Sequence, residues 1–350
     1  MEACFRKYVL EFKRPSGTSR GILHSKDTYF IILKQGEKYG IGECGLLRGL
    51  SIDDVDNYED KLLEICQHVN LGLQELLARS HGYPSIQFGL EQAFNSIDAE
   101  DPFILFPSDF TERERPIPIN GLLWMGEESF LLEQLEEKIR AGFTCIKLKV
   151  GALDFDAEIR FLETLRRRYP AGNIEIRLDA NGAFHPDEAL DKLKLLARYQ
   201  VHSIEQPIAS GQWDIMSELC RKSPIDIALD EELIGISDIN DKLKLLQIVM
   251  PRYIILKPSL IGGFAGSREW IELANKLKIS WWITSALESN IGLNAIAQWT
   301  HTLGTDMFQG LGTGSLYINN FDSPLQIKQG MLYYNRKLKW PADLIKEICL

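Results

Sequence analysis

Five charged residues stand at the ends of strand-like apolar runs, and their spacing constrains the fold more than any other feature of the sequence. In chain order they are Lys149, Asp179, Glu205, Asp230 and Lys257. The smallest gap, from Glu205 to Asp230, is 25 residues, and the largest, from Lys149 to Asp179, is 30. In a barrel of alternating strands and helices, each strand–helix unit returns the chain to the same rim, one strand further on. We therefore expect all five groups around one mouth.

The sequence beyond Pro107 alternates between apolar strand candidates and amphipathic helix candidates. The strand candidates are residues 117–122, 145–150, 174–179, 202–205, 225–230, 253–257, 280–285 and 307–311. Helix candidates include residues 130–141, 155–169, 186–199, 239–250, 267–277 and 293–303. This alternation predicts an α/β fold, a (β/α)7β TIM-like barrel. A doubly wound open sheet ranks second, because polar residues follow almost every strand instead of gathering at one switch point.

A different pattern precedes the barrel. The strand candidates there are residues 4–13, 28–34 and 38–43, and the helix candidates are residues 51–71, starting at Ser51, and 85–96. We expect an α+β capping domain over residues 1–112 and a catalytic barrel over residues 113–316. A C-terminal segment, residues 317–350, is expected to return to the capping domain and complete it.

Composition excludes several classes of function. The net charge of -10 argues against binding to nucleic acid or to an anionic membrane surface, and no run approaches the ~18 apolar residues of a membrane span. No GxGxxG follows a first strand of the alternating pattern, and no GxxxxGK[ST] or HExxH motif is present, so neither a nucleotide cofactor nor a histidine zinc site is expected. The cysteines form no CxxC pair and are expected to be reduced thiols in a cytoplasmic protein. They are Cys4, Cys44, Cys66, Cys145, Cys220 and Cys349. The sequence predicts no oligomeric state.

Three of the five charged groups are acids that would repel one another at one mouth. They would take up protons, or they would bind a cation. Oxygen ligands suit a hard divalent ion, so Asp179, Glu205 and Asp230 are candidate ligands for Mg²⁺, with Mn²⁺ as an ion that could substitute. The alternative is that one or two of these acids cap helices or pair with arginines.

The lysines are candidates for acid–base chemistry. Lys147 and Lys149 point to the same side of their strand, because positions i and i+2 share a face. This cation–cation pair, together with a metal ion, favours a neutral Lys149 that can act as a general base. Lys257 would approach a carboxylate substrate from the opposite face. For an isolated pair like Lys147 and Lys149, an exposed edge strand is the alternative.

The order lysine, three acids, lysine resembles the enolase superfamily, in its muconate-lactonizing subgroup. Within that subgroup the chain resembles the o-succinylbenzoate synthase family of menaquinone biosynthesis. The resemblance covers the whole chain and rests on six segments. They are Lys147-Leu-Lys149, Leu178-Asp-Ala-Asn-Gly-Ala-Phe184, Glu205-Gln-Pro207, Leu229-Asp-Glu231, Lys257-Pro-Ser-Leu-Ile-Gly-Gly263 and Ser285-Ala-Leu-Glu-Ser-Asn-Ile-Gly292.

The resemblance implies a lyase that removes water from a cyclohexadiene carboxylate. Lys149 would abstract the α-proton and then protonate the departing hydroxyl, while a charged Lys257 and Mg²⁺ would stabilise the enediolate. Asn181 and Glu231 would contact the residues that hold the metal, without holding it themselves. For Asn181 the alternative is a local turn contact, since Asn181-Gly182 is also a turn signal. Substrate-binding candidates are Lys147, Asn120, Ser285, Asn290, Thr313 and Gly314, each of which could instead only close its strand–helix loop. Two loops, residues 15–21 and 46–50, are expected to cover the mouth, where Arg48 could meet a second carboxylate.

Related reactions use nearly the same groups. N-succinylamino acid racemisation, dipeptide epimerisation and muconate cycloisomerisation all remain alternatives within the superfamily. The sequence Gly312-Thr-Gly314 near the eighth strand offers no DxD-type motif to hold a substrate ammonium, which disfavours the epimerase. A barrel retained only as a binding protein is the non-enzyme alternative, and the intact set of lysines and acids argues against it.

Overall fold

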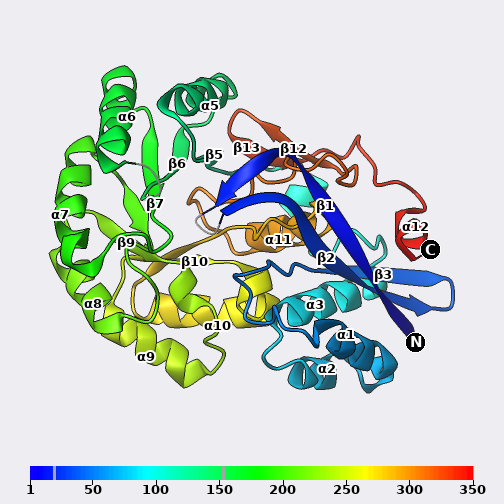
Figure 1. Cartoon of the computed structure of the whole chain (residues 1–350). Helices are drawn as coiled ribbons and strands as arrows, with labels where there is room; N and C mark the ends of the chain where they lie inside the picture. The colour runs from blue at the N-terminus through cyan, green and yellow to red at the C-terminus, as the bar shows by residue number, and fades with distance from the viewer. Residues whose placement is uncertain (19–20, 152–153, 350) are drawn as a thin grey trace.

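A curled sheet of seven parallel strands forms the centre of the computed structural model, which describes residues 1–18, 21–151 and 154–349 (Figure 1). Its strands are β5 (Gly121–Leu123), β6 (Cys145–Lys149), β7 (Glu175–Asp179), β8 (Ser203–Glu205), β9 (Asp226–Leu229), β10 (Tyr253–Leu256) and β11 (Ser280–Ile283). Isolated parallel bridges from Ile119 to Gln309 and from Thr284 to Gly310 join both edges of the sheet to the segment expected as the eighth strand. The predicted TIM-like barrel is confirmed, although its eighth position is held by bridges and not by a regular strand.

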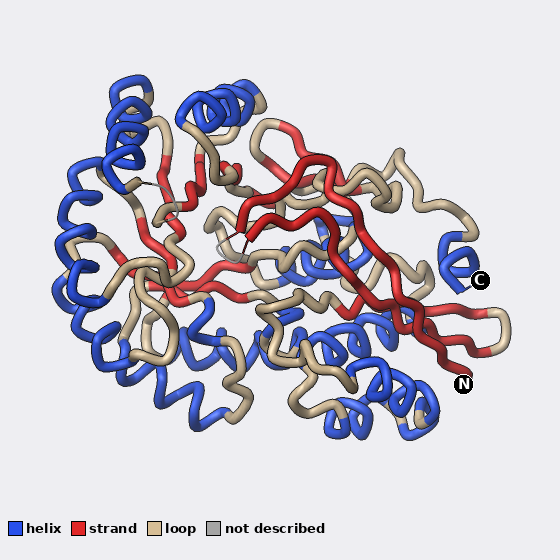
Figure 2. Tube along the Cα trace, viewed as in Figure 1, coloured by secondary structure: helices blue, strands red, loops and turns tan. Residues whose placement is uncertain are grey.

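Helices cover the outside of this sheet (Figure 2). They are α5 (Glu128–Arg140), α6 (Phe155–Arg168), α7 (Pro186–Leu196), α8 (Trp213–Lys222), α9 (Ile239–Val249), α10 (Gly263–Lys276) and α11 (Asn290–Thr302). Short 3-10 turns, η2 (Ala197–Tyr199), η3 (Glu231–Leu233) and η4 (Pro258–Leu260), separate some strands and helices. The apolar stripe of each helix and the outward face of the strands form one large buried core. Among the helices that the structure describes, none has the length and apolar content needed to cross a membrane.

A separate antiparallel sheet belongs to the capping module. The sheet consists of β1 (Glu2–Thr18), β2 (Gly21–Gln35) and β3 (Lys38–Cys44). The helices of the module are α1 (Tyr58–Gln67), η1 (Val69–Leu71), α2 (Leu73–Arg79), α3 (Pro84–Asp98) and α4 (Asp109–Glu112). Helix α3 lies so close to β3 that a side chain at Gly42 would collide with the backbone of Gly89 and Ala93.

Two local expectations in this module were wrong. The segment expected as a loop, residues 15–21, is strand at both ends: β1 continues to Thr18 and β2 begins at Gly21, and residues 19–20 lie outside the described residues. The helix expected from Ser51 begins only at Tyr58. Its intended first turn is diverted because Asp53 turns inward and accepts hydrogen bonds from the backbone N–H and the hydroxyl of Ser85 at 2.9 and 2.6 Å.

The segment after the barrel serves both modules. The hairpin of β12 (Leu325–Lys328) and β13 (Met331–Tyr334) pairs with β4 (Ile117–Pro118), which lies just before the first barrel strand. Helix α12 (Leu344–Cys349) instead packs on the capping module, where Leu344 and Ile345 complete an apolar cluster with Phe30, Ile32 and Ile41.

Candidate active site

Strand register brings the predicted acids and lysines to one end of the barrel. In the β6–β7 and β7–β8 ladders, Lys149 lies opposite Asp179, and Asp179 lies opposite Glu205. Asp230 follows β9 directly, and Lys257 follows β10 directly. Because all of these strands are parallel, their carboxyl ends share one rim, and the five side chains meet there.

Each acid at this rim is paired with a lysine. Lys147 bridges two of them, with its Nζ 2.9 Å from Asp179 Oδ2 and in a short contact with Glu205 Oε2. Lys149 Nζ lies 3.2 Å from the same Asp179 oxygen. Across the mouth, Lys257 Nζ lies 2.5 Å from Asp230 Oδ2. Three lysine side chains therefore lie among the three carboxylates that were expected to repel one another.

Burial and charge set the ionisation of these groups. Burial favours the neutral form of Asp179, but the ammonium groups of Lys147 and Lys149 outweigh it and hold its pKa below the ordinary value. For Glu205, burial wins and raises the pKa to about 7, with the neighbouring carboxylates adding to the effect. Burial also disfavours the ammonium of Lys257, but nearby carboxylates raise its pKa above the ordinary value. Lys257 is therefore a cation at neutral pH.

The oxygen atoms at the rim are suited to a hard cation. Glu205 Oε1 is buried and has no hydrogen-bond partner. Asn181 accepts a hydrogen bond from Lys149 Nζ at 2.6 Å and donates one to Glu231 Oε1 at 2.9 Å. These two bonds connect Lys149 to a fourth buried acid. Within residues 1–18, 21–151 and 154–349, no three acidic, histidine or cysteine side chains are already gathered closely enough to enclose an ion. The oxygen donors of the three acids suit a hard cation, and in this structure lysine ammonium or amine nitrogens contact them instead.

A cavity of about 460 Å³ opens above these groups. Lys147, Lys149, Lys257 and Asp179 line its floor, together with Asn181 and Glu231. The expected residues Asn120, Ser285 and Thr313 also line it, and the hydroxyls of the last two lie 2.6 Å apart. Its remaining walls are mostly apolar, with Leu23, Leu47, Leu50, Leu122, Trp124, Leu287 and Leu316. The volume and the mixed lining suit a small organic acid.

Two of the expected substrate-binding residues lie elsewhere. Asn290 donates its amide to the carbonyl of Phe321 at 2.6 Å, and its Oδ1 would meet a side chain placed on Gly314 at 2.7 Å. Neither residue lines the cavity. They close the junction between the start of α11 and the segment after the barrel, because polar loop residues satisfy neighbouring backbone groups as readily as they bind ligands.

Other lining residues were not anticipated from the sequence. Leu23, on β2 of the capping module, lines the cavity. Trp124 and Leu316 are apolar residues in loops, and no local pattern distinguishes them from core residues. Arg48 is at the mouth, as the loop 46–50 suggested, but it is paired with Asp54 at 2.5 Å and Asp27 at 3.3 Å.

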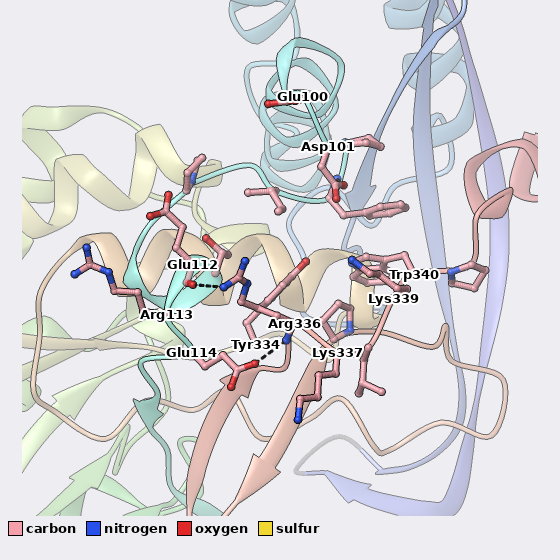
Figure 3. Close-up of a pocket in the computed structure, with 18 of the residues that line it drawn as sticks. Glu100, Asp101, Glu112, Arg113, Glu114, Tyr334, Arg336, Lys337, Lys339 and Trp340 are labelled. Atoms are coloured by element: carbon pink, nitrogen blue, oxygen red, sulfur yellow. Dashed lines mark hydrogen bonds between the residues drawn. The ribbon is translucent and has the colours of Figure 1, made fainter.

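A larger cavity, of about 980 Å³, lies away from the barrel rim (Figure 3). It is a groove between the segment around Glu112 and Glu114 and the chain from Tyr334 to Trp340. Arg336 crosses beneath it and donates to the Glu112 carbonyl and the Glu114 carboxylate at 2.8 and 2.9 Å. Acidic and basic groups are mixed along this groove, without the paired lysines and acids of the rim. We therefore place the candidate active site in the smaller cavity.

The barrel and its ring of lysines and acids define a class of protein that comparison also identifies. The chain belongs to the enolase superfamily: the model of the enolase C-terminal domain-like family matches residues 131–337. The chain is 44% identical to the o-succinylbenzoate synthase of Desulfotalea psychrophila, over 95% of this chain and 98% of that protein. These matches confirm the resemblance identified from the sequence.

Similarity to solved structures supports the same family assignment. The crystal structure of MenC from Desulfotalea psychrophila superposes with a TM-score of 0.85 at 41% identity, covering 95% of this chain and 99% of that one. A dipeptide epimerase from Enterococcus faecalis, solved with Mg and the dipeptide L-Leu-L-Tyr, gives a TM-score of 0.81 at 18% identity, covering 95% and 96%. The second likeness establishes the shared fold alone.

Proposed function

We propose that this protein is an o-succinylbenzoate synthase, a lyase of menaquinone biosynthesis that acts in the cytoplasm. Its reaction is the Mg²⁺-dependent syn-dehydration of 2-succinyl-6-hydroxy-2,4-cyclohexadiene-1-carboxylate (SHCHC) to o-succinylbenzoate. The observation that carries the proposal is that Lys149 and Lys257 line one cavity together with Asp179, which the strand register places between Lys149 and Glu205. The identity of 44% to a synthase over nearly the whole chain supports this choice within the superfamily.

Asp179, Glu205 and Asp230 would hold the metal. The unpaired, buried Glu205 Oε1 supports this role, since a buried carboxylate oxygen without a partner is costly unless a cation or donor meets it. Mg²⁺ prefers oxygen ligands, and Mn²⁺ could replace it. When bound, the ion would hold the substrate carboxylate and offset the negative charge that develops there.

Lys149 would serve as both base and acid. It would remove the proton from the carbon bearing the substrate carboxylate, and the electron pair would move onto the carboxylate oxygens. In the second step the C–O bond breaks, and Lys149 returns the proton to the leaving hydroxyl, which departs as water. A single lysine can do both because a syn-elimination places the proton and the hydroxyl on one face. The contact with Asn181 Oδ1 at 2.6 Å would aim the Lys149 side chain.

Lys257 would act as a cation from the other side of the cavity. Its raised pKa, set by nearby carboxylates against the effect of burial, keeps it charged at neutral pH. A fixed cation in a buried site stabilises negative charge more in the transition state than in the ground state. Lys147, Asn120, Ser285 and Thr313 would orient the substrate. Its ring would lie against apolar walls such as Trp124.

Racemisation of N-succinylamino acids is the second candidate. The observation that favours it is the pair Lys149 and Lys257 lining one cavity, because two lysines could remove a proton on one face and return it on the other. Dehydration ranks first because of the identity to a synthase.

One preparation should be tested on both reactions. We expect Mg²⁺-loaded protein to convert SHCHC to the aromatic product, followed by ultraviolet absorbance. Its kcat/KM should exceed that for α-hydrogen exchange of N-succinylamino acids in D2O. Lys149→Ala should lower the dehydration rate by at least the ~10²–10⁴-fold that general-base catalysis typically contributes. A larger kcat/KM for the amino acid, or no turnover of SHCHC, would overturn the proposal.

A further inference from the structure

A buried glutamate of the capping module caps a helix of the barrel. Glu43, at the end of β3, is completely buried and accepts hydrogen bonds at both carboxylate oxygens. Its Oε1 accepts from the Ser289 N–H at 2.9 Å, and its Oε2 accepts from the Ser289 hydroxyl at 2.5 Å and the Gly292 N–H at 2.9 Å. These donors are at the start of α11, where unpaired N–H groups and the helix dipole favour a negative charge.

The glycine at 292 makes room for this contact. A Cβ on Gly292 would lie only 2.8 Å from Glu43 Oε2. Glycine in a helix is otherwise unfavourable compared with alanine; here a Cβ would meet the Glu43 carboxylate and, at 2.9 Å, the Cβ of Glu288 as well. From the capping side, Thr28 donates to Glu43 Oε1 at 2.8 Å, and the Glu43 carbonyl accepts from Gln92 at 3.0 Å. Hydrogen bonds therefore hold both the carboxylate and the backbone carbonyl of Glu43.

The residues just before this cap form a wall of the candidate active site. Ser285, Ala286 and Leu287 all line the cavity, and they are joined to Ser289 through Glu288. Glu288 is also completely buried; it accepts from the Ala286 N–H at 2.7 Å and from the hydroxyl of Ser259, two residues after Lys257.

A buried lysine completes the group. Lys26 is only 4% exposed, and its Nζ has no hydrogen-bond partner among the described residues. Burial lowers the pKa of Lys26, and the neighbouring carboxyl groups of Glu43 and Glu288 oppose that shift. Buried polar groups of this kind hold one geometry, because a displacement leaves buried hydrogen-bonding atoms without partners.

We infer that Glu43 is a positioning residue of the active site: by capping α11 from the capping module, it fixes the cavity wall 285–287 and so sets substrate affinity. The inference rests on the proposed function for its substrate. Glu43 touches neither the cavity nor the reacting groups. Loss of the cap should loosen the wall while Lys149 and Lys257 keep their partners.

The test is Glu43→Gln, with Glu91→Gln as the matched control. A glutamine presents an amide N–H₂ where a carboxylate oxygen now accepts, so at least one N–H group at the start of α11 is left unpaired. Glu91 is a comparable buried glutamate of the capping module, which accepts from the N–H groups of Phe264 and Ala265 at the start of α10, outside the cavity wall. Each variant replaces a buried carboxyl group that accepts from N–H groups with an amide, at the start of a different barrel helix.

The first readout needs no substrate. Hydrogen exchange of the peptide over residues 285–293 should be at least ~10-fold faster in Glu43→Gln, since losing one hydrogen bond to a charged group shifts a local opening equilibrium by roughly that factor. The same peptide in Glu91→Gln should exchange as in the wild type. Unchanged exchange in Glu43→Gln would overturn the inference, even if SHCHC proved not to be the substrate.

The second readout uses ligand. With Mg²⁺ present, the Kd of o-succinylbenzoate by titration calorimetry and the KM for SHCHC should both rise about 10-fold in Glu43→Gln, with kcat within about 3-fold of wild type. If Glu43→Gln does not fold, Gly292→Ala supplies the test by pressing a methyl group against the carboxylate. A wild-type protein that neither binds nor turns over these ligands would refute the proposed function. A normal Kd and KM in a folded variant would refute the role of Glu43.

Discussion

Glu91 provides a test of how burial sets the stability of the module interface. It lies on α3, is 8% exposed, and accepts from the Phe264 N–H at 2.5 Å and the Ala265 N–H at 3.0 Å. Burial raises its pKa from an ordinary 4.5 to about 7, and the two N–H groups oppose the shift only in part. The folded protein therefore holds a proton on Glu91 at a pH where the unfolded chain has released it.

The sign of the stability effect follows from this shift. The pKa of Glu91 is higher in the folded protein than in the unfolded chain. The stabilisation of the folded state by protonated Glu91 is therefore complete below pH 4.5 and is lost as pH rises through about 7. Between pH 5 and pH 8 the lost stabilisation is about 2–3 kcal/mol, since one unit of pKa shift corresponds to about 1.4 kcal/mol. An unfolding entropy of about 2.1 cal/mol/K per residue converts this into roughly 3–4 °C for a chain of this length.

The comparison is wild type against Glu91→Gln, with Tm measured by scanning calorimetry at pH 5 and pH 8. Glutamine does not titrate, so the Tm advantage of the wild type should be roughly 3–4 °C larger at pH 5 than at pH 8. Glu75→Gln is the control, since its side chain is 53% exposed and paired only at the surface with Arg79. An equal difference at the two pH values, or a larger one at pH 8, would mean that burial does not keep Glu91 protonated.

Three further predictions concern the rim. With chelator present to remove metal ions, Lys147→Met should lower the free energy of unfolding by about 3–5 kcal/mol, because the buried Glu205 loses its cationic partner. An unchanged midpoint of denaturant unfolding would contradict this prediction. Chelation should abolish turnover, and added Mg²⁺ should restore it. Asp179→Ala or Asp230→Ala should eliminate the rise in Tm that Mg²⁺ causes. Full activity in excess chelator would exclude a metal role. Lys257→Ala should lower kcat and kcat/KM by the same factor in steady-state assays, whereas a change in KM alone would mark Lys257 as a binding residue.

The parts of the structure that repeat at a fixed interval were predictable from the sequence. One strand–helix unit brings the chain back to the same rim, so the spacing of Lys149, Asp179 and Glu205 was enough to predict them as neighbours, and the ladders pair them in that order. The amphipathic pattern of residues 155–169 likewise predicted α6 to within a residue.

Features that depend on distant partners were not predictable. Ser51 and the acids after it carry the pattern of a helix start, but Asp53 is drawn away by Ser85, which lies 32 positions further on. Asn290 has the polarity of a binding residue, and only the position of Phe321 shows that its amide is already used. The cap from Glu43 to Ser289 joins residues 246 positions apart and leaves no local pattern in the sequence.

The docking of α12 on the capping module has a consequence for the order in which the chain can fold. Phe30, Ile32 and Ile41 are made early, but the apolar cluster that buries them also needs Leu344 and Ile345. At about 5–20 residues per second, a ribosome needs roughly 15–60 s to make the roughly 300 residues between them. During that time the β1–β3 sheet exposes an apolar face on the nascent chain, next to a barrel that is still forming. Chaperones that bind exposed apolar strands therefore have a long interval in which to act on this protein.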